Sequence, residues 1–125
     1  ELMRQFIISI PHLPDARLNP NNLRRLHWTE RREATDTARQ EIGWPAKMKW
    51  REAAMVKVKV SYKFTVKDGR KHDVDNLVSA CKPYIDGLID VNVMMSDDYK
   101  YMSIGKASIE RGKKDSTTIT VAEMI

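Results

Sequence analysis

Apolar and polar side chains alternate most clearly between Val56 and Val66. Val, Tyr or Phe occupies every second position there, and Lys, Ser or Thr fills the positions between them. A period of two places the two sets on opposite faces of a β-strand. The segment therefore predicts a strand with one buried face and one basic face, whose lysines are Lys57, Lys59 and Lys63.

A second pattern lies between Leu77 and Ile89, where apolar residues recur three and four positions apart. This spacing predicts one helix with a single apolar stripe. Pro83 falls off the stripe and is expected to kink the helix, and Cys81 falls on it and is expected to be an inert core residue. A polar stripe on the same helix consists of Asp75, Ser79, Lys82 and Asp86.

The N-terminal third of the chain predicts a strand, a loop and a helix. The apolar run 6–10 is stopped by proline, and residues 11–22 contain three prolines and three asparagines, which is typical of a loop. Thr29 is expected to cap a helix. That helix is expected to close at Gly43, because Trp44-Pro45 cannot continue it.

Two further strands are predicted near the C-terminus, over residues 101–109 and 117–121. The predicted order is then β-α-β-α-β-β. With 125 residues, the chain is expected to form one domain over residues 1–125. The expected fold is α+β, a mixed sheet with helices packed on it.

The charge of the chain favours a polyanionic partner. Its net charge is +5 and its pI is about 9.4, which is typical of proteins that bind nucleic acid or an anionic membrane surface. No apolar run approaches the ~20 residues that span a bilayer, and no glycine-rich phosphate loop occurs, so neither a membrane nor a small-molecule cofactor is expected. A single cysteine favours a reduced, cytoplasmic setting.

Within this basic chain the acidic residues are unevenly placed. Seven of the ten aspartates lie between Asp68 and Asp98, whereas no glutamate occurs from Ala53 to Ile109. The window from 68 to 98 carries a net charge of −4, and the rest of the chain +9. Crowded carboxylates repel one another unless a cation lies between them. The pattern is that expected of an enzyme that binds a metal and cuts a polyanion.

Asp73 and Asp75 are the first candidate metal ligands, since side chains two positions apart in an extended segment point the same way. Asp97-Asp98 supplies further carboxylates before the next strand. Mg²⁺ prefers such oxygen ligands, and Mn²⁺ is expected to substitute for it. The alternative is that Asp75 or Asn76 only caps the helix, that Asp97-Asp98 only marks a turn, and that the polar stripe is a solvated face.

Three motifs together are similar to one known family. R-K-H-D-V-D-N, K-x-x-x-D-G-L and D-D resemble the RusA family of Holliday junction resolvases, whose pattern is D-x-D-N entering a helix, a lysine, D-A-L and a later D-D. The resemblance extends to the early L-N-P-N-N…H-W segment and to the closing T-I-T-V-A-E-M. It thus covers most of the chain, and its central motif is the most specific part.

The resemblance implies roles for particular residues. Asp73, Asp75 and Asp98 match the essential carboxylates that hold the metal, and Asp97 is a weaker candidate. Lys82 matches the family lysine when the chain is aligned through the later motif. About three extra residues then separate it from the D-x-D-N segment, close to one helical turn. The hypothesis is that Pro83, beside this insertion, bends the lysine back toward the site.

Basic residues near these motifs are candidate DNA contacts. Arginines around His27-Trp28 are placed to grip phosphates while the indole stacks on a base, although the indole is as compatible with a core position. The lysines of the alternating strand either face DNA or are only solvated. The full set of expected DNA-binding residues is Arg70, Lys71, His72, Asn76, Arg24, Arg25, Arg31 and Arg32.

The function that the resemblance implies is a Mg²⁺-dependent endonuclease that resolves four-way DNA junctions by paired symmetric nicks in recombination and repair. It implies a homodimer, since two opposed nicks need two sites, and a cytoplasmic, nucleoid-associated protein encoded by a bacterium or a phage. Two alternatives stay open. One is a nuclease of the same fold that acts on flaps or forks, and the other is an inactive junction-binding protein with a structural ion.

Overall fold

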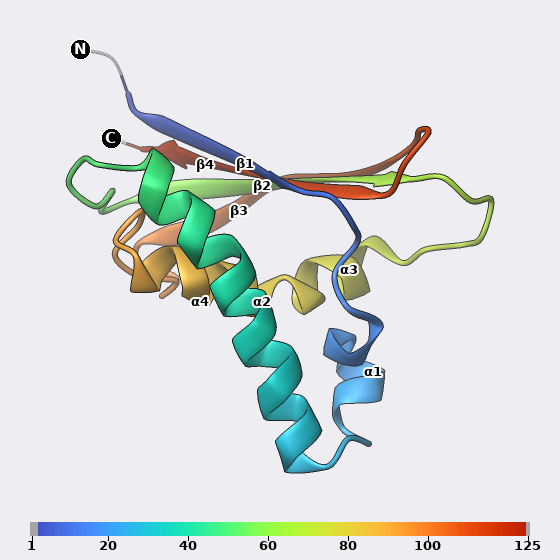
Figure 1. The fold of residues 1–125 in the computed structure, drawn as a ribbon. Coiled ribbons are helices and arrows are strands. Elements are labelled where there is room, and N and C mark those ends of the chain that lie inside the picture. The colour runs from blue at the N-terminus through green and yellow to red at the C-terminus, as the bar shows by residue number, and fades with distance from the viewer. Residues whose placement is uncertain (1–2, 125) are drawn as a thin grey trace.

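Four strands form one mixed sheet in the order β1-β4-β2-β3 (Figure 1). The computed structural model describes residues 3–124 and has β1 at Gln5–Ile10, β2 at Val58–Val66, β3 at Met102–Arg111 and β4 at Ser116–Glu123. β4 runs antiparallel to both of its neighbours, and β2 and β3 are parallel. The predicted α+β class and the predicted β-α-β-α-β-β order are both confirmed.

Three helices cover one face of the sheet and leave the other face without a helix (Figure 1). They are α2 (Trp28–Lys49), α3 (Val74–Ala80) and α4 (Lys82–Asp90). The segment predicted as a loop contains a 3₁₀ turn, η1 (Ala16–Leu18), and a short helix, α1 (Pro20–Leu23), so that prediction was incomplete. None of the helices in the part of the chain that the structure describes could cross a membrane.

The alternating strand is confirmed over β2, where every second side chain from Val58 to Val66 is buried. Lys59 and Lys63 lie on the opposite, open face and are exposed. The strand begins two residues later than predicted, and Val56 is half exposed. The apolar face of β2 therefore packs toward the helices, and its lysine face is open to solvent.

α2 is longer than the sequence predicted, and both of its predicted ends were wrong. His27 caps its N-terminus instead of Thr29, and the helix runs through Pro45 to Lys49. Proline removes one helical hydrogen bond at that point. The buried stripe nevertheless continues at Ala46, which is fully buried, so burial of the next turn outweighs the lost hydrogen bond.

The predicted single helix over 77–89 is in fact two helices that meet at Cys81. Pro83 lies in the first turn of α4 and is buried, rather than kinking a continuous helix off its apolar stripe. In the first turn the missing N–H has no helical partner to lose, and the fixed φ angle of proline suits the helix. The chain therefore changes direction between α3 and α4 at little cost.

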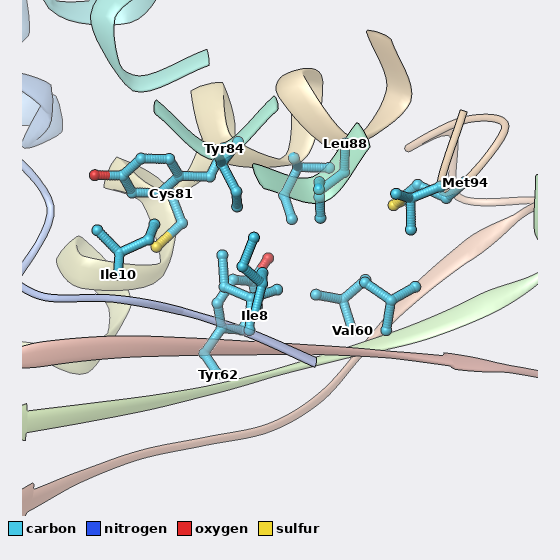
Figure 2. Close-up of a cluster of buried hydrophobic side chains, with 14 of the residues drawn as sticks. Ile8, Ile10, Val60, Tyr62, Cys81, Tyr84, Leu88 and Met94 are labelled. Carbon is cyan, nitrogen blue, oxygen red and sulfur yellow. The ribbon is translucent and has the colours of Figure 1, made fainter. Parts of the chain in front are cut away.

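The core fills the space between the sheet and α4 (Figure 2). Cys81 is fully buried there, and burial raises the pKa of its thiol to about 12, so the prediction of an inert core cysteine is confirmed. The labelled members of the cluster are Ile8, Ile10, Val60, Tyr62, Cys81, Tyr84, Leu88 and Met94. These residues come from β1, β2, α4 and the segments at either end of α4, so one cluster joins all of these parts.

α4 packs directly against the backbone of α2 at Gly87. A Cβ atom placed there would lie 2.6 Å from the carbonyl oxygen of Arg39 and 2.6 Å from Cγ2 of Ile42. Backbone cannot move aside as a flexible side chain can, so only glycine fits at this crossing. Beside the crossing, Arg39 forms a two-point ion pair with Asp90, with the Nη2–Oδ1 distance 2.7 Å.

The segment after β1 is tied to α2 through His12. Its Nδ1 lies 2.6 Å from the carbonyl oxygen of Leu13, and its Nε2 lies 2.6 Å from Oε2 of Glu41. A neutral imidazole has one N–H only, so two oxygen acceptors favour the doubly protonated ring. Burial lowers the pKa of His12, but the hydrogen bonds to Leu13 and Glu41 outweigh it, and the pKa is raised above 6.5.

We predict that Gly87→Ala lowers the free energy of unfolding by about 1–3 kcal/mol, because the new methyl group overlaps the α2 backbone. Urea denaturation measures the change. Gly43→Ala is the matched control, since its Cβ would meet no atom closer than 3.7 Å, and alanine favours a helix interior. Equal stability of the Gly87 variant and the parent would contradict the close contact.

We also predict that His12 makes stability depend on pH. Because its pKa is raised in the folded protein, its contribution is complete below pH 6.5 and is lost as the pH rises through the folded pKa. The loss is at most about 1 kcal/mol, since the pair is partly exposed. Unfolding at about pH 6 and about pH 8.5 should differ less for His12→Gln than for the parent. An unchanged difference would contradict this role.

Candidate acidic site

Asp73 and Asp75 lie at the start of α3, and both are exposed. Asp73 is the N-cap: its Oδ1 accepts a hydrogen bond from the backbone N–H of Asp75 at 2.9 Å. The sequence offers Asp75 or Asn76 as the residue that caps this helix, but the cap is Asp73. The side chain of Asp75 accepts no hydrogen bond from any residue in 3–124, and Asn76 is half-buried. Both carboxylates are therefore at the surface. The extended segment from which a shared direction was expected is not present, since Asp75 lies in the first turn of α3 and helical side chains two positions apart do not face each other.

The second acidic segment is a tight turn before β3. Oδ1 of Asp98 accepts a hydrogen bond from the N–H of Lys100 at 3.0 Å, and its carbonyl oxygen accepts from Tyr101 and Met102. The expected turn at this position is therefore present. Asp98 itself is exposed, and its Oδ2 has no hydrogen-bond partner among the described residues.

Lys82 lies between two carboxylates at the start of α4. Its Nζ is 2.6 Å from Oδ1 of Asp86 and 2.7 Å from Oδ2 of Asp97. Burial lowers the pKa of Lys82, but the bonds to both partners outweigh it and raise the pKa, and the same bond lowers the pKa of Asp97. Lys82 is therefore a protonated cation beside the Asp97-Asp98 segment.

The ion pairs divide the aspartates of the window into two groups. Four of them are paired with basic side chains: Asp68 with Arg70 and His72, Asp86 and Asp97 with Lys82, and Asp90 with Arg39. Within residues 3–124, the three that have no ion-pair partner are Asp73, Asp75 and Asp98. These are the three that the resemblance implies as metal ligands, so each of them carries a negative charge that no basic side chain among residues 3–124 contacts.

The donor set suits a hard divalent cation, since it consists of exposed carboxylates that have no ion-pair partner among residues 3–124. In the described part of the chain, however, no three His, Cys, Asp or Glu side chains come close enough together to hold a metal. Mg²⁺ usually takes one or two carboxylates and keeps several waters. A magnesium site at Asp73 and Asp75, shared with Asp98, stays a prediction.

The loop that leads into α3 is held by Asp68. Its carboxylate accepts hydrogen bonds from Nε2 of His72 at 3.0 Å and from Nε of Arg70 at 2.9 Å, which lower its pKa to about 2. His72 is largely buried by this contact, whereas Lys71 is exposed. Of the expected DNA contacts in this loop, Lys71 is thus open to a partner, while His72 and Arg70 also brace the loop.

A hollow of about 190 Å³ lies between this loop and the end of β3, and Arg70, His72 and Arg111 contribute to its lining. Arginine side chains commonly contact phosphate, but the carboxylates of Asp68 and Glu110 also line this hollow, so its charge is mixed. Arg111 was not among the residues expected to bind DNA. Its place at the end of a strand gave no local signal, because the pairing of β2 with β3 brings it to the loop.

The N-terminal half of α2 points away from the sheet (Figure 1), and the other expected DNA contacts lie on it or in the segment just before it. Trp28 is 64% exposed, so it is a surface residue rather than a core anchor. The nearest basic ion pair there, Arg32 with Asp36, is long at 3.7 Å. The arginines that are exposed around this indole are Arg24, Arg25, Arg31 and Arg32.

We predict that Asp73 has a structural role that can be separated from its charge. Asp73→Ala should lower the free energy of unfolding by about 1 kcal/mol, because the cap of α3 is lost, whereas Asp73→Asn keeps a capping oxygen and should cost little. Asp75→Ala is the matched control, with at most the helix-dipole effect of about 0.3–1 kcal/mol. Equal losses for Asp73→Ala and Asp73→Asn would contradict the cap.

Two comparisons with known proteins find no relative of this chain. A scan against models of known protein families finds no match, and a search of curated proteins finds none that is significantly similar.

Proposed function

We propose that this protein is a Mg²⁺-dependent, structure-selective endonuclease that cuts branched DNA, with the four-way junction as its substrate. The observation that carries the proposal is the division of the acidic window. Basic side chains form ion pairs with four of its seven aspartates, whereas Asp73, Asp75 and Asp98 have no such partner among residues 3–124. These same positions match the metal ligands of the family that the motifs resemble.

The proposed reaction is hydrolysis of a phosphodiester. The oxygen of water forms a new bond to phosphorus, and the bond from phosphorus to the 3′ oxygen breaks, leaving a 5′-phosphate and a 3′-hydroxyl that takes up a proton. Asp73 and Asp75 would hold Mg²⁺ with Asp98 as the third ligand. When bound, the ion supplies activation of the water and polarisation of the phosphate.

Lys82 has a distinct part in this proposal. Its pKa is raised by Asp86 and Asp97, so it carries a proton at neutral pH and acts as a fixed positive charge, not as a base. A cation beside the Asp97-Asp98 turn offsets negative charge that develops on the phosphate. Asp86 and Asp97 serve to hold the ammonium in position, since Nζ lies 2.6 Å and 2.7 Å from their oxygens.

DNA would be held chiefly through its phosphates. The net charge of +5, the exposed arginines near Trp28 and the exposed Lys71 favour contacts of this kind, whose affinity falls steeply with salt. Selection of a junction would then depend on shape and bendability more than on base sequence. A symmetric homodimer would provide the two sites that paired nicks require.

A second candidate function is an inactive junction-binding protein that uses its acidic residues structurally. Two observations favour it: Asp73 caps a helix and Asp98 orders a turn, and no three metal-binding side chains in residues 3–124 come together. A nuclease that prefers flaps or forks is the other rival, and comparing these substrates at equal concentration separates it from a junction resolvase.

We predict that Asp75→Asn abolishes nicking of an end-labelled four-way junction in Mg²⁺ while binding of the junction in EDTA is unchanged. Asp75 makes no side-chain hydrogen bond in the described structure, so its loss should not disturb the fold. Gel analysis of the cleaved strands is the measurement. In the same assay Lys82→Ala should slow nicking by roughly 10²–10³-fold, as expected for loss of one stabilising charge.

Asp115→Asn is the matched control, because it removes an aspartate outside the acidic window. The proposal fails if the parent binds the junction tightly and nicks nothing in Mg²⁺ or Mn²⁺. The inactive junction-binding protein then replaces it. Unchanged turnover of Lys82→Ala would remove the lysine from the mechanism but leave the carboxylates in place.

A further inference from the structure

A group of exposed apolar side chains lies beside the second acidic segment. Tyr99 is 84% exposed, Met95 57%, Val56 49% and Tyr101 42%. Single exposed apolar residues are ordinary in proteins, but a contiguous group marks a surface that meets a partner. Exposed tyrosines carry most of this area, and their rings offer flat faces for stacking.

Backbone contacts place these residues next to one another. Met55 and Met94 form a parallel bridge, with hydrogen bonds from Met55 N–H to Val93 and from Met95 N–H to Met55. The N–H of Val58 donates to the carbonyl oxygen of Tyr101 at 2.7 Å. Segment 55–58 is thus joined to segment 94–101 at both ends. Together with Lys57 and Lys100, the four apolar residues form what we call the tyrosine patch.

The turn that carries Tyr99 is held by several contacts. The N–H of Asp98 donates to Oγ of Ser96, the N–H of Lys100 donates to Oδ1 of Asp98, and the carbonyl oxygen of Asp98 accepts from Tyr101. The ion pair of Asp97 with Lys82 fixes the turn to α4. The backbone that carries the exposed ring of Tyr99 is therefore ordered, so little backbone entropy is lost when a partner stacks on the ring.

The charge of the patch suits a phosphate that accompanies a stacked ring. Neither Lys57 nor Lys100 has an ion-pair partner within residues 3–124, and both line a small hollow with Tyr99 and Tyr101. Asp97 shares the single cation of Lys82 with Asp86, and Asp98 has no ion-pair partner among residues 3–124, so the two lysines also lie beside a turn that keeps negative charge. Two unpaired lysines beside two exposed tyrosines are the combination that single-stranded nucleic acid requires.

We propose that the tyrosine patch binds unpaired nucleotides, with Tyr99 stacking on a base and Lys57 and Lys100 contacting the adjacent phosphates. The inference rests on the proposed function and deepens it, since branched DNA has unpaired or weakly stacked bases at the branch and the patch adjoins Asp98. In an intact duplex the base faces are covered by their neighbours, so the exposed ring of Tyr99 favours single strands over duplex.

The test measures binding alone, in EDTA, by fluorescence anisotropy of a labelled oligothymidylate. Tyr99→Ala should weaken binding by roughly 5- to 150-fold, the value of one stacked base. Tyr99→Phe keeps the ring and should retain the affinity. Lys100→Ala should reduce the slope of affinity against salt by about one charge. Trp44→Ala, an exposed ring of α2 outside the patch, is the matched control.

Unchanged affinity of Tyr99→Ala, or an equal loss in Trp44→Ala, would overturn the proposal. So would concentration-dependent self-association of the parent that Tyr99→Ala abolishes while oligonucleotide binding persists, since a second copy of the chain would then cover the patch. Junction nicking is measured separately. If Tyr99→Ala loses oligonucleotide binding and the parent nicks no junction, the tyrosine patch is supported and the nuclease is rejected. If the parent nicks junctions and Tyr99→Ala binds the oligonucleotide as the parent does, the nuclease is supported and the patch is rejected.

Discussion

The contact between α2 and α4 at Gly87 is the constraint on which the arrangement of the helices depends. With no side chain at this position, α4 approaches the backbone of α2 near Arg39, and both helices can rest on the same face of the sheet. α4 in turn places Lys82 at one of its ends and the segment to Met94 at the other.

The sequence predicts the fold where local periodicity and burial agree. The alternation in β2 is of this kind, because one face of the strand meets the core. The helix ends were mispredicted where a local signal and tertiary packing disagree. Pro45 marks a helix end by sequence, but Ala46 is buried beyond it, and Pro83 begins a helix because the chain turns there. A helix-breaking residue such as proline therefore marks the end of a helix only where no buried residue follows it.

The candidate site, too, is predictable where the signal is local and not where residues far apart in sequence come together. The spacing of the motifs identifies the candidate acidic residues. Lys82 and Asp86 lie four positions apart in a helix, and this spacing predicts their ion pair. The bonds from Lys82 to Asp97 and from His12 to Glu41 join residues that are distant in sequence, so only the folded chain reveals them. Because no family or curated protein matches, the link to resolvases depends on the motifs and on which aspartates remain unpaired.

The start of α2 has a dynamic consequence. Its first residues, 28–33, are all exposed, and burial begins only at Ala34. A helical turn without buried contacts opens and closes locally at a free energy far below that of global unfolding. The tip that bears Trp28 can therefore fray and re-form while the base of the same helix stays fixed on the sheet. A fully rigid surface fits a partner in one arrangement only, whereas the exposed start of α2 can adjust while the rest of the helix stays packed on the sheet.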